Sequence, residues 1–255
     1  MNPMLDRFRS AILDALPSDR LSGDLLISRS GQLATYYAPF EHVNTAARVV
    51  LVGITPGVFQ AQRALEKLRA ALRSGLGDGD ALSQAKDVAS FAGPMRAALV
   101  EMLDYVGLQT ALGLCSCSEL FTSASNLVHH TSALRNPVLV GGRNYTGSPA
   151  ILRTPYLRSM VEDWLADEVR QLPSALWVPL GREPKAVLRS FAAQGLIKGE
   201  CLLDGLPHPS GANAERIAYF LRRKLRENLS SKTNADTIDT ARAHLVLKVK
   251  GQCNR

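Results

Sequence analysis

The sequence has no apolar run that approaches the ~18 residues needed to cross a bilayer, so an integral membrane protein is excluded. Two aspartates and two arginines interrupt its first 17 residues, whereas a secretory signal needs an unbroken apolar core. We therefore expect a cytoplasmic protein. Charged residues make up 21% of the chain and hydrophobic residues 46%. These values are ordinary for globular proteins and exclude collagen-like, coiled-coil and disordered chains.

Cysteine is scarce, with four in a chain of 255 residues. Cys115 and Cys117 are one residue apart, and no second pair at metal-ligand spacing accompanies them. His129 and His130 also lack a third ligand at a suitable spacing. We therefore expect no metal site, and no disulfide framework in a chain of this length without export signals.

Signatures of several common enzyme classes are missing. There is no P-loop, no Gly-x-Ser-x-Gly nucleophile turn, and no His-x-Glu with the Pro-Cys-x-x-Cys of the zinc deaminases. Residues 75–79 are rich in glycine, but they follow a predicted helix and not a strand, so they are a poor dinucleotide signature. We expect no cofactor.

Positive charge is concentrated at the C-terminal end. Residues 214–255 hold ten Lys/Arg against four Asp/Glu, so they carry nearly all of the formal net charge of +7. A basic segment on a nearly neutral body suits a polyanion such as nucleic acid. A solvated basic helix without a partner is the alternative interpretation.

Apolar, β-branched runs alternate with helical periodicity, which predicts βαβ units and a mostly parallel sheet. The predicted strands are residues 47–53, 119–128, 175–181 and 200–205. We therefore expect an α/β fold, namely a single three-layer α/β/α domain over residues 1–230 with a central, mostly parallel four-stranded sheet. Residues 231–255 are expected to be a basic C-terminal extension.

A segment rich in Gly, Pro and Asn covers residues 134–155, before a predicted helix over residues 156–171. Loops of this length without regular structure are uncommon and often serve as lids or binding loops. Residues 141–148, Gly-Gly-Arg-Asn-Tyr-Thr-Gly-Ser, supply donors and acceptors suited to a polar ligand.

Two tight loops follow the first and last predicted strands. Residues 53–60 read Gly-Ile-Thr-Pro-Gly-Val-Phe-Gln, and residues 206–213 read Leu-Pro-His-Pro-Ser-Gly-Ala-Asn. Ligands of open α/β sheets bind beyond the carboxyl ends of the strands, which makes both loops candidate sites. Each loop alone has a purely structural alternative, a common strand-end turn in the first and a helix cap in the second.

At these residues the sequence resembles the uracil-DNA glycosylase superfamily. The resemblance is carried by Val-Gly-Ile-Thr-Pro-Gly at residues 52–57 and His-Pro-Ser-Gly at residues 208–211. Weaker support comes from Asn126-Leu-Val and from residues 179–182, and the order of elements covers residues 45–228. The resemblance implies a DNA glycosylase that flips out a base and hydrolyses its N-glycosidic bond.

The resemblance also implies roles for the second loop. His208 would donate a hydrogen bond to the base carbonyl as negative charge develops on the departing base. Ser210, Gly211 and the following backbone amides would hold a DNA phosphate. Ala212 and Asn213 would enter the groove near the vacated stack.

In the first loop, the resemblance implies that Gly53 and Ile54 offer backbone amides to the base and help to position a water. Phe59 would stack on the flipped base, and a core position at a helix start is its alternative. Asn126 would read the base edge through its side-chain amide. The alternative for Asn126 is an ordinary turn or cap residue.

Two positions depart from the family pattern. Thr55 stands where family members commonly carry Asp or Asn, and a hydroxyl can position water but holds no charge near the cationic sugar. Gly57 stands where the uracil-restricted branch has a bulky tyrosine, so the pocket wall is open. Together with residues 141–148, these departures suggest an enlarged pyrimidine, such as glucosylated 5-hydroxymethylcytosine of phage DNA excised in antiphage defence, or else uracil-type repair.

No lysine or N-terminal proline stands in either motif to form a Schiff base, so we expect a monofunctional enzyme that leaves an abasic site. We expect a monomer with DNA as partner. Two alternatives stay open. One is a non-catalytic module that binds DNA or a base, and the other is an α/β enzyme that processes a nucleoside or nucleotide.

Overall fold

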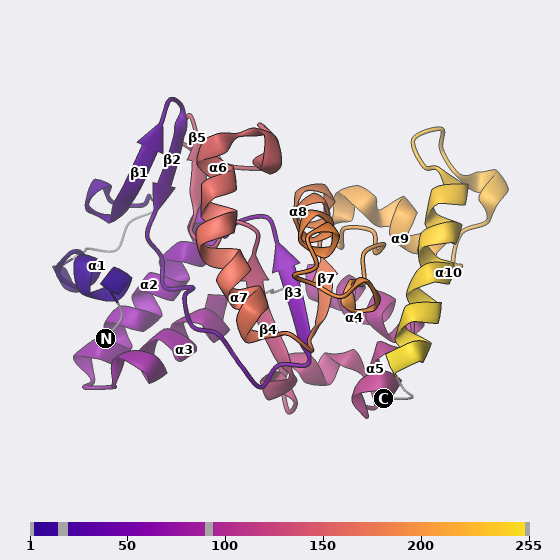
Figure 1. Cartoon of the computed structure of the whole chain (residues 1–255), viewed down its shortest axis with the longest axis horizontal. Coiled ribbons are helices and arrows are strands. Elements are labelled where there is room, and N and C mark those ends of the chain that lie inside the picture. The colour runs from indigo at the N-terminus through magenta and orange to yellow at the C-terminus, as the bar shows by residue number, and fades with distance from the viewer. Residues whose placement is uncertain (1–2, 15–19, 90–93, 253–255) are drawn as a thin grey trace. The chain divides into compact units, whose positions relative to one another are not determined.

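The computed structural model describes residues 3–14, 20–89 and 94–252, and it is a mixed α/β protein (Figure 1). Contacts divide the chain into two compact units, and each is built from three stretches of sequence. The first unit comprises 1–43, 53–90 and 131–168, and the second comprises 44–52, 91–130 and 169–255. The predicted boundary at residue 230 stays a prediction.

The first unit combines an antiparallel sheet with helices. Its elements are α1 (Pro3–Asp14), β1 (Leu26–Ser30), β2 (Leu33–Tyr36), α2 (Val58–Arg73), α3 (Asp78–Ala89), β5 (Val138–Val140), β6 (Arg143–Asn144) and α6 (Pro155–Met160). The sheet has the order β1-β2-β5-β6, and every neighbouring pair is antiparallel. After α6 the helix continues through a π-helical turn (Val161–Leu165) into α7 (Ala166–Gln171), which confirms the predicted helix.

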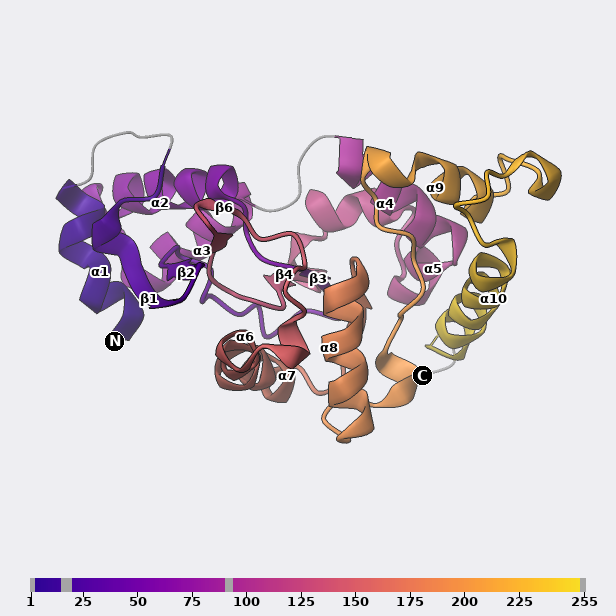
Figure 2. The same ribbon diagram turned by 90° about the horizontal axis from the view of Figure 1, so that it is seen from above.

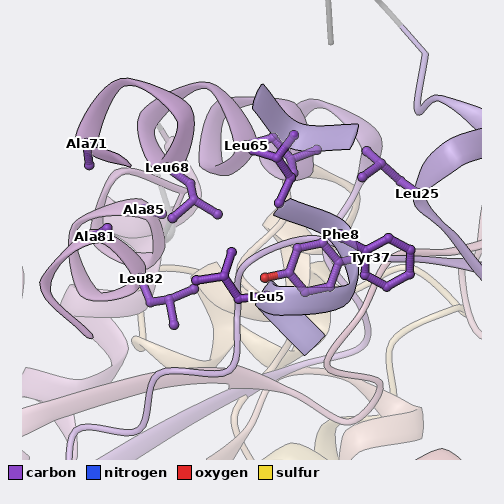
Figure 3. Close-up of a cluster of buried hydrophobic side chains, with 11 residues drawn as sticks. Leu5, Phe8, Leu25, Tyr37, Leu65, Leu68, Ala71, Ala81, Leu82 and Ala85 are labelled. Carbon is purple, nitrogen blue, oxygen red and sulfur yellow. The ribbon is translucent and has the colours of Figure 1, made fainter. Parts of the chain in front are cut away.

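The core of the first unit forms between the helices and the start of the sheet (Figure 3). Leu5, Phe8 and Ile12 recur on one face of α1, so all three are buried. The Phe8 and Tyr37 rings stack with centroids 4.9 Å apart. Leu65 and Leu68 of α2 complete this cluster against α3. Each such leucine contributes about 1.5–3 kcal/mol when it leaves water.

Residues 134–155 are not the structureless loop that was predicted. They contain β5 and β6, joined by Gly141 and Gly142 at φ +55° and +80°. Two adjacent residues at positive φ match the twist of a tight hairpin, and glycine adopts this conformation without strain. Residues 141–148 are therefore presented from a hairpin on the edge of the antiparallel sheet.

The second unit contains the parallel sheet. Its elements are β3 (Val49–Gly53), α4 (Pro94–Tyr105), α5 (Leu108–Leu112), β4 (Val128–Ser132), β7 (Leu176–Pro179), α8 (Arg182–Ala193), α9 (Ala214–Phe220) and α10 (Ala235–Gln252). The strand order is β4-β3-β7, with β3 parallel to β7 in the register Val50↔Trp177. The predicted strands at 47–53 and 175–181 are thus confirmed as β3 and β7.

The predicted central sheet of four mostly parallel strands is wrong. The described residues form a three-stranded sheet and a separate four-stranded antiparallel sheet. Residues 200–205 add only one parallel bridge, Trp177↔Leu202, followed by a hydrogen bond from the Leu203 N–H to the Trp177 carbonyl. Beyond this segment, Pro207 and Pro209 have no N–H with which the ladder could continue.

The strand predicted at residues 119–128 is also wrong. A 3₁₀ helix covers Cys117–Phe121 because Ser116 and Glu119 form a reciprocal cap. The Ser116 hydroxyl accepts the Ser118 N–H at 3.1 Å, and the Glu119 carboxylate accepts the Ser116 N–H at 3.2 Å. These hydrogen bonds satisfy backbone N–H groups at the start of the 3₁₀ helix, and strand β4 begins only at Val128.

The basic C-terminal segment is ordered as α10 through Gln252. Leu245 and Val249 lie four residues apart and are both buried. Both ribbon views show α10 beside α9 (Figures 1 and 2). Arg242 of α10 is buried and donates to the carbonyls of Tyr219 and Phe220 at 3.1 and 3.2 Å. Because Arg242 binds the last carbonyls of α9, the two helices are joined by charge as well as by packing.

Candidate functional site

The first candidate loop follows β3, leads into α2 and belongs to the first unit. The carbonyls of Gly53 and Ile54 accept the N–H groups of Ala133 and Leu134 at 2.8 and 2.9 Å. The loop bends at Ile54, and Gly57 is the N-cap of α2. The carbonyls of Gly53 and Ile54 therefore hold the segment after β4.

Thr55 is fixed by the segment that follows β4. Its hydroxyl donates to the carbonyl of Asn136 at 2.9 Å and accepts the N–H of Val138 at 3.2 Å. Asn136 is buried, and its side-chain oxygen accepts the N–H of Ala38 at 3.4 Å. The Thr55 hydroxyl thus joins the first loop to the start of β5, so its donor is used within the protein.

Gly57 lies beside Asn144, a residue that was predicted only as part of the segment 141–148. A Cβ at Gly57 would stand 3.5 Å from the Nδ2 atom of Asn144, which is on β6. The Asn144 Oδ1 accepts the N–H of Val58 at 3.0 Å, the first helical residue of α2. Asn144 is exposed, and its Oδ1 is fixed by this bond. The side of the loop left open by Gly57 is therefore lined by an amide.

Phe59 is a surface residue and not part of the core. It lies in the first turn of α2 with 70% of its surface exposed. The guanidinium carbon of Arg63, one turn further along the helix, lies 5.9 Å from its ring centroid. The core alternative for Phe59 is thus wrong, and its ring is available for stacking.

The second candidate loop carries His208 within the second unit. The ring is half-buried between two prolines, and its Nδ1 accepts the N–H of Ser210 at 3.2 Å. Burial lowers the pKa of His208 below its ordinary value of 6.5. The imidazole is therefore neutral at pH 7. Because Nδ1 is the acceptor, its single N–H is at Nε2.

Gly181 lies directly against the His208 ring. It follows β7 at φ +106°, a conformation that side chains other than hydrogen rarely adopt. A Cβ at this position would stand only 3.2 Å from the Cδ2 atom of His208. Glycine at residue 181 therefore leaves the space that the imidazole occupies.

The rest of the second loop is a polar turn. The Ser210 hydroxyl accepts from the side-chain amide of Asn213 at 3.2 Å, and the Asn213 oxygen accepts from Arg216 at 2.8 Å. Gly211 and Ala212 between them are exposed. These bonds leave the Ser210 hydroxyl proton available as a donor. The DNA contacts predicted for these four residues stay predictions.

Asn126 is predicted to lie at the end of a strand, but in the structure it precedes a strand. It is exposed in the 3₁₀ turn Ser125–Leu127, which precedes β4. Its carbonyl accepts from the side-chain amide of Asn44 at 2.9 Å. The residue directly after β4 is Ala133, and the first side-chain amide that follows this strand in the sequence belongs to Asn136. Base reading by Asn126 stays a prediction.

Within each unit, the structure brings predicted residues into contact with residues that are far away in the sequence. Thr55 and Gly57 meet Asn136 and Asn144 in the first unit, and His208 meets Gly181 in the second. Among the residues described, no group of three or more His, Cys, Asp or Glu could hold a metal ion. In the same part of the chain, no helix is both long and apolar enough to cross a membrane.

The fold and these loops define a mixed α/β protein with a proline-flanked, neutral histidine beside a strand-end glycine. The chain is 33% identical over 234 residues to a protein of Bacillus subtilis (strain 168) described as "Uncharacterized protein YoxB". The match covers 89% of this chain and 91% of that protein. The chain therefore belongs to the YoxB family. No family model and no solved structure matches it.

Proposed function

We propose that the chain is a monofunctional DNA glycosylase that hydrolyses the N-glycosidic bond of a modified pyrimidine and leaves an abasic site. The observation that carries this proposal is His208. A neutral imidazole with its Nδ1 bonded to the Ser210 N–H presents one fixed donor at Nε2. Two flanking prolines restrict the backbone at His208, and Gly181 leaves room for the ring.

The chemistry of base release requires such a donor. When the glycosidic bond breaks, positive charge develops on the deoxyribose and negative charge on the departing base. A preorganised N–H that bonds the base carbonyl stabilises that negative charge, and loss of one such donor typically costs about 10²–10³ in rate. A neutral imidazole also avoids placing a second positive charge near the cationic sugar.

The substrate that we propose is an enlarged pyrimidine. Gly57 offers no side chain, and the Asn144 amide lines its open side with a polar group. Asn144 and its neighbours come from the β5–β6 hairpin, whose residues 141–144 are exposed. A polar, open wall suits a base with a hydroxylated substituent, such as glucosylated 5-hydroxymethylcytosine of phage DNA. The proposal includes a cytoplasmic monomer that needs no cofactor and acts in antiphage defence.

Strand cleavage after alkali treatment tests the proposal. Purified protein is incubated with one DNA that contains uracil and one that carries glucosylated 5-hydroxymethylcytosine, and abasic sites are revealed as alkali-labile breaks. We expect breaks in the DNA with the enlarged base. Breaks only in the uracil DNA would replace the substrate by uracil, and no breaks in either DNA would contradict a glycosylase.

A non-catalytic DNA- or base-binding protein of the same fold is the second candidate, and Thr55 favours it. The Thr55 hydroxyl donates to the Asn136 carbonyl, so it lacks both a charge and a free proton with which to orient an attacking water. The same two DNAs separate the candidates. Binding without any product would favour this second function.

A further inference from the structure

Arg222 adopts a backbone conformation that is unfavourable for its type. It follows α9 at φ +58°, and it is the one non-glycine residue with positive φ in the described part of the chain. The N–H of Arg223 returns to the carbonyl of Ala218 at 2.7 Å, which closes a helix-ending turn. Glycine is the usual residue at this position because a Cβ crowds the backbone there. Residue 222 therefore carries a side chain at a position where glycine would be more stable.

The Arg222 side chain is positioned by an aromatic residue. Its Nε donates to the hydroxyl of Tyr105 at 3.0 Å, and Tyr105 is the last residue of α4. Arg222 is exposed, and among the described residues no carboxylate pairs with it. The two Nη groups are therefore left free to bind a ligand. They form the fork that suits a phosphate oxygen pair.

A hollow of ≈ 760 Å³ opens beside this pair, between the end of α9 and α10. Its rim carries four Lys/Arg and two acids, so it is net positive. Two of its apolar side chains are unusually exposed, Leu225 at 61% and Leu247 at 67%. Tyr105 lines the same hollow with 37% of its surface exposed, and its ring is 5.8 Å from that of Phe220.

The other cations that line the hollow are held to different degrees. Arg242 is buried, and Lys224 is half-buried and bonds Glu215 at 2.8 Å. Arg226 bonds Asp236 at 2.6 Å at the surface, where such pairs contribute little, so Arg226 can exchange its partner for a phosphate. Arg222 needs no such exchange, and it is therefore the cation best prepared for an anionic ligand.

We propose that this hollow binds a single-stranded stretch of DNA, with Arg222 on a phosphate and exposed bases against Tyr105, Leu225 and Leu247. Basic rims that follow the backbone and aromatic or apolar faces that receive unstacked bases are the combination by which proteins hold single strands. A duplex hides its base faces and would leave the apolar side chains in water. This surface is separate from His208, so it goes beyond the proposed base excision.

Binding of a fluorescein-labelled oligodeoxythymidine of twelve nucleotides, followed by anisotropy, tests the proposal. Thymidine offers no damaged or modified base, so the result does not depend on excision. We expect Arg222→Gly to weaken binding by about tenfold. Its dependence on salt should fall by about 0.7 in log–log slope, as for one lost phosphate contact on a single strand.

The same variant has a second readout that a destabilised protein would not show. Glycine relieves the positive φ, so Arg222→Gly should raise the melting temperature by about 2–4 °C while it weakens binding. Arg223→Gln is the matched control. Arg223 is one residue away, loses the same charge, pairs with Glu101 at 2.8 Å and does not line the hollow. We expect its affinity to stay within about twofold of the wild type.

Two results would overturn the proposal. The wild type could fail to bind the oligonucleotide, or Arg222→Gly and Arg223→Gln could weaken binding equally, which would indicate only a general effect of charge. In the first case, Arg222-dependent binding of a leucine-containing polyglutamate peptide would assign the hollow to an acidic protein. A catalytically inactive protein that still binds the oligonucleotide would leave this surface supported and contradict only the excision.

Discussion

The N–H of Ser210 donates to the Nδ1 atom of His208 over 3.2 Å, so the loop that carries the histidine also fixes its tautomer. The contact joins residues two positions apart, and the prolines on both sides of His208 restrict the backbone between them. The donor at Nε2 is therefore preorganised before any ligand arrives, which is the property that electrostatic catalysis requires.

Activity is expected to depend on the neutral form of His208. Burial lowers its pKa below 6.5, so the ring is neutral above that value and gains a proton as the pH falls through the lowered pKa. We expect single-turnover base release to be constant from about pH 7 to 9 and to decrease on the acid side of about pH 6.5. In His208→Gln the acid decrease attributable to this ring should vanish, and an unchanged profile would contradict the assignment.

Gly181→Ala should disturb the imidazole directly. Both the positive φ and the 3.2 Å approach to His208 Cδ2 oppose a methyl group, so the ring must shift. We expect base release to slow by about tenfold to a hundredfold, since small misplacements of reacting groups have effects of this size.

Gly195→Ala is the control for Gly181→Ala. Gly195 also has positive φ, at +75°, and nothing lies within 4 Å of its Cβ position. Both variants should lose about 1–2 kcal/mol of unfolding free energy. Equal effects of the two variants on base release would show that Gly181 acts through stability alone.

Much of the helical framework could be predicted because its signal is local. The α2 helix shows buried residues at spacings of three and four, and the strands β3 and β7 are continuous apolar runs. The strand predicted at residues 119–128 failed because the Ser116–Glu119 cap outweighs the β-propensity of the segment. The sequence does contain a signal for the β5–β6 hairpin, namely Gly141-Gly142 between strand-forming residues, but the overall composition of the segment favours a loop.

The candidate site likewise combines local contacts, which the sequence could predict, with contacts between distant residues, which it could not. The His208–Ser210 contact lies within one loop and follows from its sequence, whereas the partners of Thr55 are 81 and 83 residues away. The Asn144 contact with Val58 spans 86 residues. No local pattern encodes such pairings, because they depend on how the sheet brings β5 and β6 to the first loop.

Thr55 is expected to stabilise the first unit. In Thr55→Val the Val138 N–H loses its acceptor in a buried strand, and the Asn136 carbonyl loses a donor. We expect a loss of about 2–3 kcal/mol in urea unfolding. Thr55→Ser keeps the hydroxyl and should lose less than about 1 kcal/mol. A Val variant as stable as the Ser variant would show that these bonds contribute nothing.

Lys86 is expected to make the free energy of unfolding depend on pH in the alkaline range. It is buried, and its Nζ donates to the carbonyls of Phe40 and His42 at 2.9 and 2.6 Å. Burial lowers its pKa to about 8, although Glu168 opposes this shift. Folding therefore releases a proton between about pH 8 and 10.5, and this lysine's contribution to stability rises with pH across that window.

The comparison of wild type with Lys86→Met isolates this effect. The variant leaves two carbonyls without a donor and should lose about 2–4 kcal/mol at pH 7. The difference in unfolding free energy between the two proteins should grow from pH 8 to 10. A difference that is constant over that range would contradict a depressed lysine pKa.

Single-turnover excision by wild type, His208→Ala and His244→Ala tests whether His208 promotes release of the base. The control, His244, is an exposed histidine on α10. On the DNA that the wild type cleaves, we predict that His208→Ala is slower by about 10²–10³ while it keeps its fold, and that His244→Ala is unchanged. Equal rates for wild type and His208→Ala, in proteins with the same melting temperature, would contradict the account.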